Sequence, residues 1–211
     1  MCLTPKRKCL IIGASHAKKL SKAIINNKEF TKQFDIFTSC QSGALSTDLD
    51  FPQILKEFTE NDVVLILAFG NDIFVRHTIT TRTPFKIHLT KFEKVSETKL
   101  QQNFENIKSK IKDLKCRVIL LDNIYRHLYC CPEHVHKGIA KYQVLVNQQI
   151  KSFFGTQSIN HLYLFDQQRK FRNRGFYSTL LVDSVHFKEE YYSEIAKNLL
   201  NRISHHLTVQ C

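Results

Sequence analysis

Three residues that together can carry out nucleophilic catalysis stand near opposite ends of the sequence. Ser15 follows the apolar run at residues 8–12 and Gly13, while Asp183 and His186 lie three positions apart near the C-terminus. That spacing lets Asp183 orient His186 by a hydrogen bond, and His186 could then take the proton of the Ser15 hydroxyl. The simpler interpretation is that Ser15 and Asp183 only cap the helices that follow them.

Acyl transfer also needs hydrogen-bond donors where the carbonyl oxygen of the substrate becomes negative. The candidates are the backbone amides of Ser15 and Gly43 and the side-chain amide of Asn71. Taken separately, Gly43 and Asn71 are also residues that ordinary turns contain.

The elements that must position these residues alternate along the chain. Short apolar runs predict five strands, at residues 8–12, 34–38, 62–67, 117–121 and 162–165. Periodic apolar residues predict a helix that begins near Ser15 and further helices at residues 51–58, 100–114, 138–153 and 188–205. Residues 73–97 have weak periodicity, which predicts an irregular insertion that could contain a hairpin.

This alternation predicts an α/β fold with a parallel sheet covered by helices on both faces. In such sheets, ligands bind outside the carboxyl ends of the strands. Ser15, Gly43 and Asn71 each follow a predicted strand, so we expect them at one edge of the sheet.

The order of these residues resembles the four sequence blocks of the SGNH, or GDSL, hydrolases. The matching segments are Gly13-Ala14-Ser15, Gly43, Phe69-Gly70-Asn71-Asp72 and Asp183-Ser184-Val185-His186. Two positions depart from the family pattern: Ala14 replaces an Asp, and Phe69 occupies a Gly position with Gly70 displaced by one.

The resemblance implies one domain over residues 1–211, with a core at about residues 8–206. Its fold would be a flavodoxin-like three-layer α/β/α sandwich around a central parallel five-stranded sheet. The implied activity is that of a serine esterase or acylhydrolase that cleaves carboxylic esters, acetyl or lipid acyl, through an acyl-Ser15 intermediate. It implies Ser15, Asp183 and His186 as the triad, Ser15, Gly43 and Asn71 as the oxyanion hole, and neither a metal nor another cofactor.

A narrower resemblance concerns the esterase domains encoded by LINE-type retrotransposons. It is carried by Arg126, by the predicted helix that contains Asn147, and by residues 183–187. The chain is also similar to the SGNH-like domain of Oskar, which binds RNA without a working triad.

A second function class follows from the charge. The chain has 31 Lys and Arg against 19 Asp and Glu, a formal net charge of +12, which favours partners such as RNA, single-stranded nucleic acid or an anionic membrane surface. One segment interleaves cations with aromatic rings, as nucleic-acid grooves often do, through Arg169, Lys170, Arg172, Arg174 and Tyr177. A solvated loop with its aromatic rings in the core explains that segment equally well. The alternative to an esterase is therefore a weakly active or inactive SGNH-like domain that binds RNA.

The cysteines and the N-terminus bear on location. Seven cysteines, an odd number, favour a reducing compartment, and the first apolar run is too short for a signal peptide or a membrane span. We therefore expect a cytoplasmic protein.

Two other sequence features could form a zinc site or a substrate contact. Cys130, Cys131, His134 and His136 have the side chains of zinc ligands, but their spacing matches no familiar finger, and a solvent-facing loop is the preferred interpretation. His16 could contact a substrate or serve as a structural histidine. The physiological substrate and the oligomeric state are left open.

Overall fold

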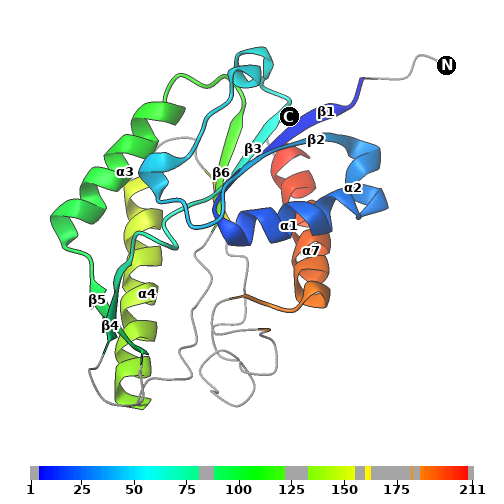
Figure 1. Ribbon diagram of the computed structural model, residues 1–211. Helices are drawn as coiled ribbons and strands as arrows, with labels where there is room; N and C mark the ends of the chain where they lie inside the picture. Colours follow the sequence, from blue (N-terminus) through cyan, green and yellow to red (C-terminus); the bar gives the residue numbers. More distant parts are fainter. Residues whose placement is uncertain are drawn as a thin grey trace.

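The computed structural model describes residues 5–80, 88–121, 133–154, 160–162, 182 and 186–208 (Figure 1). Its centre is a parallel sheet in the order β2-β1-β3-β6-β7. Strand β1 (Arg7–Gly13) pairs with β2 (Phe34–Cys40) on one side and with β3 (Val63–Leu67) on the other. Strand β6 (Arg117–Leu121) pairs with β3. The predicted α/β fold with a parallel sheet is therefore confirmed.

The last strand of the sheet is shorter than predicted. Four strands of the sheet have five to seven residues each, whereas β7 (Asn160–Leu162) has three and pairs with β6 in parallel. The predicted fifth strand at residues 162–165 overlaps β7 only at Leu162, and residues 163–165 lie outside the described part of the chain.

Helices cover both faces of the sheet, because the central strands are apolar on both sides. On one face, Cys9 and Ile11 of β1 are buried in a cluster with α1 (Ser15–Ile25) and α7 (Glu189–Thr208). Figure 1 shows these two helices side by side on that face of the sheet. A hydrogen bond between His16 and Tyr192 places the first turn of α1 next to the first turn of α7.

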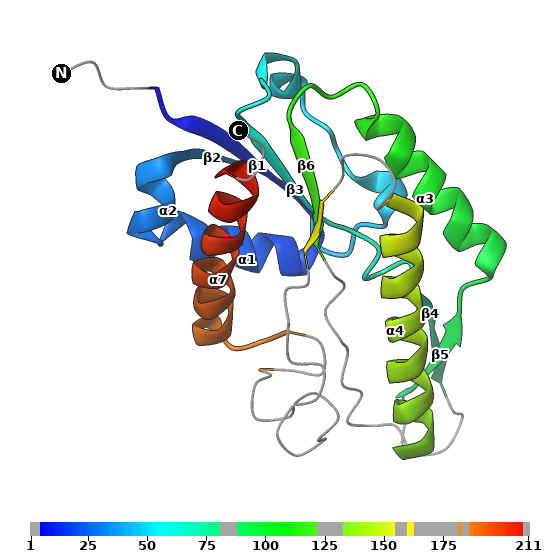
Figure 2. The same cartoon turned by 180° about the vertical axis from the view of Figure 1, so that it is seen from behind.

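The opposite face is covered by α3 (Glu97–Ile111) and α4 (Glu133–Phe154), as the view from behind also shows (Figure 2). Here Leu10 and Ile12 of β1 are buried with apolar residues of both helices. The alternation of side chains along a strand accounts for this division of the core into two clusters.

Two helices begin where a polar side chain caps them, and the apolar periodicity did not show either start. The Asn27 side chain accepts hydrogen bonds from the amides of Glu29 and Phe30 and begins α2 (Lys28–Gln33), which we had not predicted. Ser96 accepts from the Lys99 amide, so α3 begins at Glu97 and not at residue 100.

Three other segments differ from the prediction in extent or type. Helix α4 begins at Glu133, five residues earlier than expected. The helix expected at residues 51–58 is a short 3₁₀ turn, η2 (Gln53–Glu57), and a second one, η1 (Ser46–Asp48), precedes it.

The insertion at residues 73–97 contains an antiparallel hairpin of β4 (Phe74–Thr80) and β5 (His88–Lys94). Its end is tied to α4, because the Tyr142 hydroxyl donates a hydrogen bond to the Val95 carbonyl at 3.0 Å. The insertion therefore contains the hairpin that we considered.

None of the described helices is long and apolar enough to cross a membrane. Within the same residues, no group of three or more His, Cys, Asp or Glu side chains could hold a metal ion.

Gly13 is required where β1 ends, because the neighbouring strand approaches it closely. A Cβ atom at this position would collide with the Leu67 carbonyl oxygen and would lie 2.7 Å from the Cβ of Ala17. The φ of Gly13 is +156°, which L side chains rarely adopt. The turn that delivers Ser15 to the start of α1 therefore depends on a missing side chain.

We predict that Gly13→Ala lowers the free energy of unfolding by about 1 to 3 kcal/mol, the usual cost of overpacking. Urea unfolding followed by circular dichroism measures this change. The matched control is Gly138→Ala in α4, where an added Cβ meets nothing within 4 Å. There, alanine should stabilise the helix by up to about 1 kcal/mol. A Gly13→Ala protein as stable as wild type would contradict the close approach.

Candidate active site

Ser15 and His186 are brought within hydrogen-bond distance although 171 positions separate them in the chain. The Ser15 Oγ lies 3.0 Å from the His186 Nε2. Ser15 is the first residue of α1, whose N-cap is Ala14, and no side chain caps the helix. Ser15 therefore does not act as the helix cap, and its hydroxyl faces an imidazole.

The position of Ser15 also suits a developing negative charge. It stands at the N-terminus of an eleven-residue helix that has no acidic residue in its first turn. The amides and the dipole at such a helix start stabilise an anion by roughly 0.3–1 kcal/mol at an exposed site. The same helix start presents the Ser15 amide as one of the expected donors.

The loops after β2 and β3 meet the start of α1 at the same edge of the sheet. In the register of the sheet, Gly13 pairs with Cys40 on one side and with Leu67 on the other. The three chain segments that follow therefore leave the sheet together. Gly43 lies in one of these loops with a φ of +80°, in the left-handed region that glycine tolerates.

A hydrogen bond joins the two loops that carry Gly43 and Asn71. The Asn71 Nδ2 donates to the carbonyl of Ala44, the residue after Gly43, at 2.9 Å. Asn71 and Gly43 are therefore held near one another, as expected from the sequence.

Asp72 ties the same loops to helix α3. Its buried carboxylate, 3% exposed, accepts hydrogen bonds from the Ser46 hydroxyl at 2.6 Å and from the Asn103 Nδ2 at 2.7 Å. The Ser46 amide donates to it as well, at 3.1 Å. Burial raises the pKa of Asp72, while the hydrogen bonds from Ser46 act in the opposite direction. Asp72 thus has a structural role, because its hydrogen bonds connect these loops to α3 beside the site.

Sequence reasoning missed Ser46 and Asn103 as the hydrogen-bond donors to Asp72. One signal was present, because Asn103 is a buried polar residue on the apolar stripe of α3 that includes Leu100, Phe104 and Ile107. A polar residue on such a stripe needs a buried partner.

Phe69 has the backbone conformation that a glycine would hold more easily. Its φ is +69°, and it is the only described residue other than glycine with a positive φ. Its side chain is 2% exposed and packs edge-on against Phe104, with ring centroids 4.9 Å apart. The loop therefore keeps a left-handed residue where the SGNH pattern has glycine, and buried aromatic packing compensates for the strain.

Other predicted residues lie outside the described part of the chain. They are Arg126, Cys130, Cys131, Asp183 and the basic-aromatic segment with Arg169, Lys170, Arg172, Arg174 and Tyr177. His134 and His136 fall within α4, where we had expected a loop. Asn147, also in α4, is buried.

The described cysteines are unsuited to act as nucleophiles. Cys9, Cys40 and Cys116 are free thiols, and burial raises the pKa of all three, that of Cys40 and of Cys116 to about 11. They are therefore protonated at neutral pH, and the thiolate is the reactive form.

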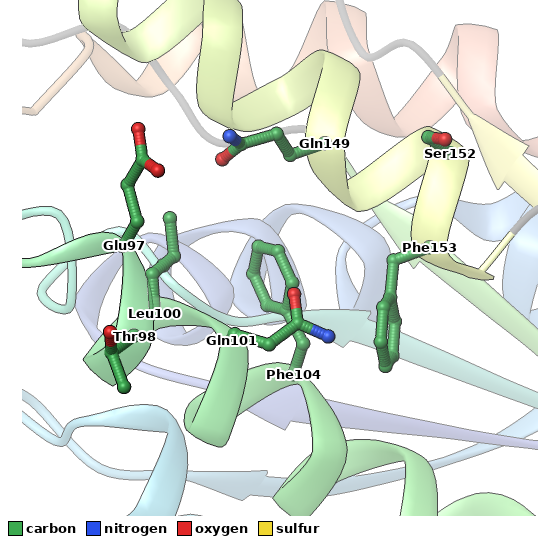
Figure 3. Close-up of a pocket in the computed structure, with 8 residues that line it drawn as sticks. All are labelled: Glu97, Thr98, Leu100, Gln101, Phe104, Gln149, Ser152 and Phe153. Atoms are coloured by element: carbon green, nitrogen blue, oxygen red, sulfur yellow. The ribbon is translucent and has the colours of Figure 1, made fainter.

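A pocket of about 470 Å³ lies between α3 and α4 (Figure 3). Phe104 and Phe153 contribute apolar walls, and Glu97, Gln101 and Gln149 contribute polar ones. Ser15, Asn71 and His186 are absent from its lining. Phe104 links this pocket to the site only indirectly, through its contact with Phe69.

We predict that Phe69→Gly destabilises the protein less than Phe69→Ala. Both changes remove the buried ring, which typically costs about 3–5 kcal/mol. Only alanine keeps the penalty of the left-handed backbone, roughly 1–2 kcal/mol. Denaturant unfolding of the two variants measures the difference. Alanine is normally the more stabilising of the two residues, so a more stable Phe69→Ala would show that this loop is not left-handed.

No protein-family model and no curated protein matches the sequence, whereas solved structures do match the fold. A GDSL-like lipase from Bacteroides thetaiotaomicron is 18% identical, with a TM-score of 0.57, over 94% of this chain and 87% of its own. The W215I variant of the acetyl xylan esterase Axe2 from Geobacillus stearothermophilus is also 18% identical, with a TM-score of 0.54, over 96% and 97%. A proposed acylhydrolase from Bacteroides fragilis has a TM-score of 0.60 at 17% identity, over 96% and 91%. The chain thus has the fold of these solved esterases and lipases.

Proposed function

We propose that this protein is a carboxylic-ester hydrolase of the SGNH type that works through an acyl-Ser15 intermediate. The observation that carries the proposal is the 3.0 Å separation of Ser15 Oγ and His186 Nε2 at the carboxyl edge of the sheet. The similarity of the fold to that of esterases and lipases supports the same reaction class.

In the acylation step, the Ser15 oxygen attacks the ester carbonyl carbon while its proton passes to His186 Nε2. The carbonyl oxygen becomes an oxyanion, for which the amides of Ser15 and Gly43 and the Asn71 side chain are the proposed donors. The tetrahedral intermediate collapses as His186 returns the proton to the leaving alcohol. Water then attacks the carbonyl carbon of the acyl-serine while His186 takes a proton from the water. His186 returns this proton to the Ser15 oxygen, which releases the acid and regenerates the serine.

Asp183 is the proposed partner of His186. The sequence places it three residues before the histidine, and a carboxylate there would hold the imidazole tautomer that leaves Nε2 able to accept the serine proton. No metal or other cofactor takes part in this proposal.

The finer parts of the proposal come from the resemblance noted in the sequence. They are a single SGNH domain with a five-stranded sheet in three layers, a relationship to the esterase domains of LINE-type retrotransposons, and acetyl or lipid acyl esters as substrates. The proposed cytoplasmic location comes instead from the seven cysteines and the short first apolar run. The strand order β2-β1-β3-β6-β7 supports the flavodoxin-like part of this description.

The alternative function, RNA binding by a basic SGNH-like domain, draws its support from the net charge of +12. An affinity for RNA that falls steeply with salt concentration would favour it, because phosphate contacts release counterions. The two functions are compatible, since a basic surface can hold an esterase near an anionic partner.

We predict that Ser15→Ala and His186→Ala each lower kcat for a short-chain nitrophenyl ester by at least about 10³-fold, because residues of a triad act as a unit. The release of nitrophenolate measures the rate. Ser193→Ala is the matched control, since Ser193 is an exposed serine of α7 whose hydroxyl donates to the Glu189 carbonyl within the same helix. Hydrolysis that persists unchanged in Ser15→Ala would refute the assignment of the nucleophile.

A further inference from the structure

His16, the residue after the proposed nucleophile, forms a buried hydrogen bond with helix α7. Its Nδ1 lies 2.7 Å from the Tyr192 hydroxyl, across 176 positions of the chain. Both side chains are buried, His16 at 9% exposure and Tyr192 at 2%. A hydrogen bond in such surroundings fixes the orientation of a ring, because its loss would leave a polar group buried without its partner.

The fixed ring of His16 packs against the proposed general base. The ring centroids of His16 and His186 are 5.0 Å apart, with the planes tilted by 43°. The Ser15 hydroxyl contacts the same imidazole at 3.0 Å. His186 is thus in contact with two consecutive residues of the first turn of α1.

The residue after His186 completes a closed set of contacts. Phe187 is fully buried, and its ring centroid lies 5.9 Å from that of Tyr192. The set therefore runs from Ser15 to His186 by the hydrogen bond, along the chain to Phe187, across to Tyr192, and back through His16 to Ser15. It joins the start of α1 to the first turns of α7.

We propose that His16 and Tyr192 form a positioning pair that holds the His186 imidazole at reacting distance from Ser15. This proposal rests on the proposed esterase function. Neither residue needs to touch the substrate. The hydrogen bond from Tyr192 fixes the His16 ring, and the His16 ring in turn supports the ring of His186.

The geometry explains why such support matters. The His186 backbone is held by its carbonyl, which accepts a hydrogen bond from the Val182 amide at 2.8 Å, and its side chain is partly exposed. The Ser15 hydroxyl and the proposed partner Asp183 orient the His186 imidazole, and the His16 ring adds a contact that limits its rotation about the side-chain torsions. A misplacement of about 1 Å can cost up to roughly 10²-fold in rate.

The test compares two variants that each remove one tyrosine hydroxyl. Tyr192→Phe removes the hydrogen bond to His16 and keeps the ring. Tyr191→Phe is the matched control, because Tyr191 is the adjacent residue and stacks on Phe187 with a centroid distance of 5.6 Å. For a nitrophenyl ester we expect kcat to fall by about 10-fold in Tyr192→Phe with little change in KM, a loss of orientation and not of binding. Tyr191→Phe should match wild type.

A double variant separates positioning from stability. His16→Phe combined with Tyr192→Phe removes both polar partners and leaves an aromatic ring at each position, so the unfolding midpoint should return toward that of wild type. We expect kcat to remain low in the double variant, because no hydrogen bond then fixes the ring against His186. Recovery of kcat together with stability would overturn the positioning role.

A second readout does not depend on ester hydrolysis. Diethyl pyrocarbonate modifies accessible imidazoles, and mass spectrometry of the peptide that contains His186 gives its rate of modification. We expect a severalfold faster reaction in Tyr192→Phe than in Tyr191→Phe. Equal modification rates with equal kcat values would overturn the inference and leave the esterase proposal standing. If wild type hydrolyses no ester, the proposed function fails, and the modification rates alone decide whether the pair holds His186.

Discussion

The pairing of β1 with both β2 and β3 is the constraint on which the candidate site depends. Parallel strands in register end at the same edge, so the start of α1 and the loops after β2 and β3 must meet there. This is the point at which the strand order reverses, where open α/β sheets bind their ligands. The close packing of Gly13 against the Leu67 carbonyl allows β1 to end at this edge and α1 to begin at once.

The loops at this edge are held by buried polar contacts more than by their own regular structure. Asn71 bonds to the Ala44 carbonyl, and Asp72 collects donors from Ser46 and Asn103. In a low dielectric such a network is strong when every member has a partner and costly when one is missing. The loops that would stabilise an oxyanion are thus connected to each other and to α3. Helix α7 is connected to α1 in a similar way, through Tyr192 and His16.

Strands and the main helices could be predicted from two sequence patterns. A strand buried on both faces is a continuous apolar run, and a helix with one buried face has apolar residues at helical spacing. Ser15, Gly43, Asn71 and His186 could be selected because their order and chemical types suited one reaction. The sequence did not show the cap at Asn27 as the start of α2, since a six-residue helix has little periodicity. Nor could it pair Asp72 with Ser46 and Asn103, or His16 with Tyr192. Such contacts join residues far apart in the chain, and only the packing of the elements brings them together.

In the proposed function, Ser15 is a nucleophile activated by His186. The most direct measurement is mass spectrometry of the protein after incubation with a fluorophosphonate, which traps an activated serine as a stable covalent adduct. We expect one adduct per chain, located on the peptide that contains Ser15, formed much more slowly in His186→Ala and at the wild-type rate in Ser193→Ala. An adduct on another residue, or none under conditions that label a known serine esterase completely, would show that Ser15 is not such a nucleophile.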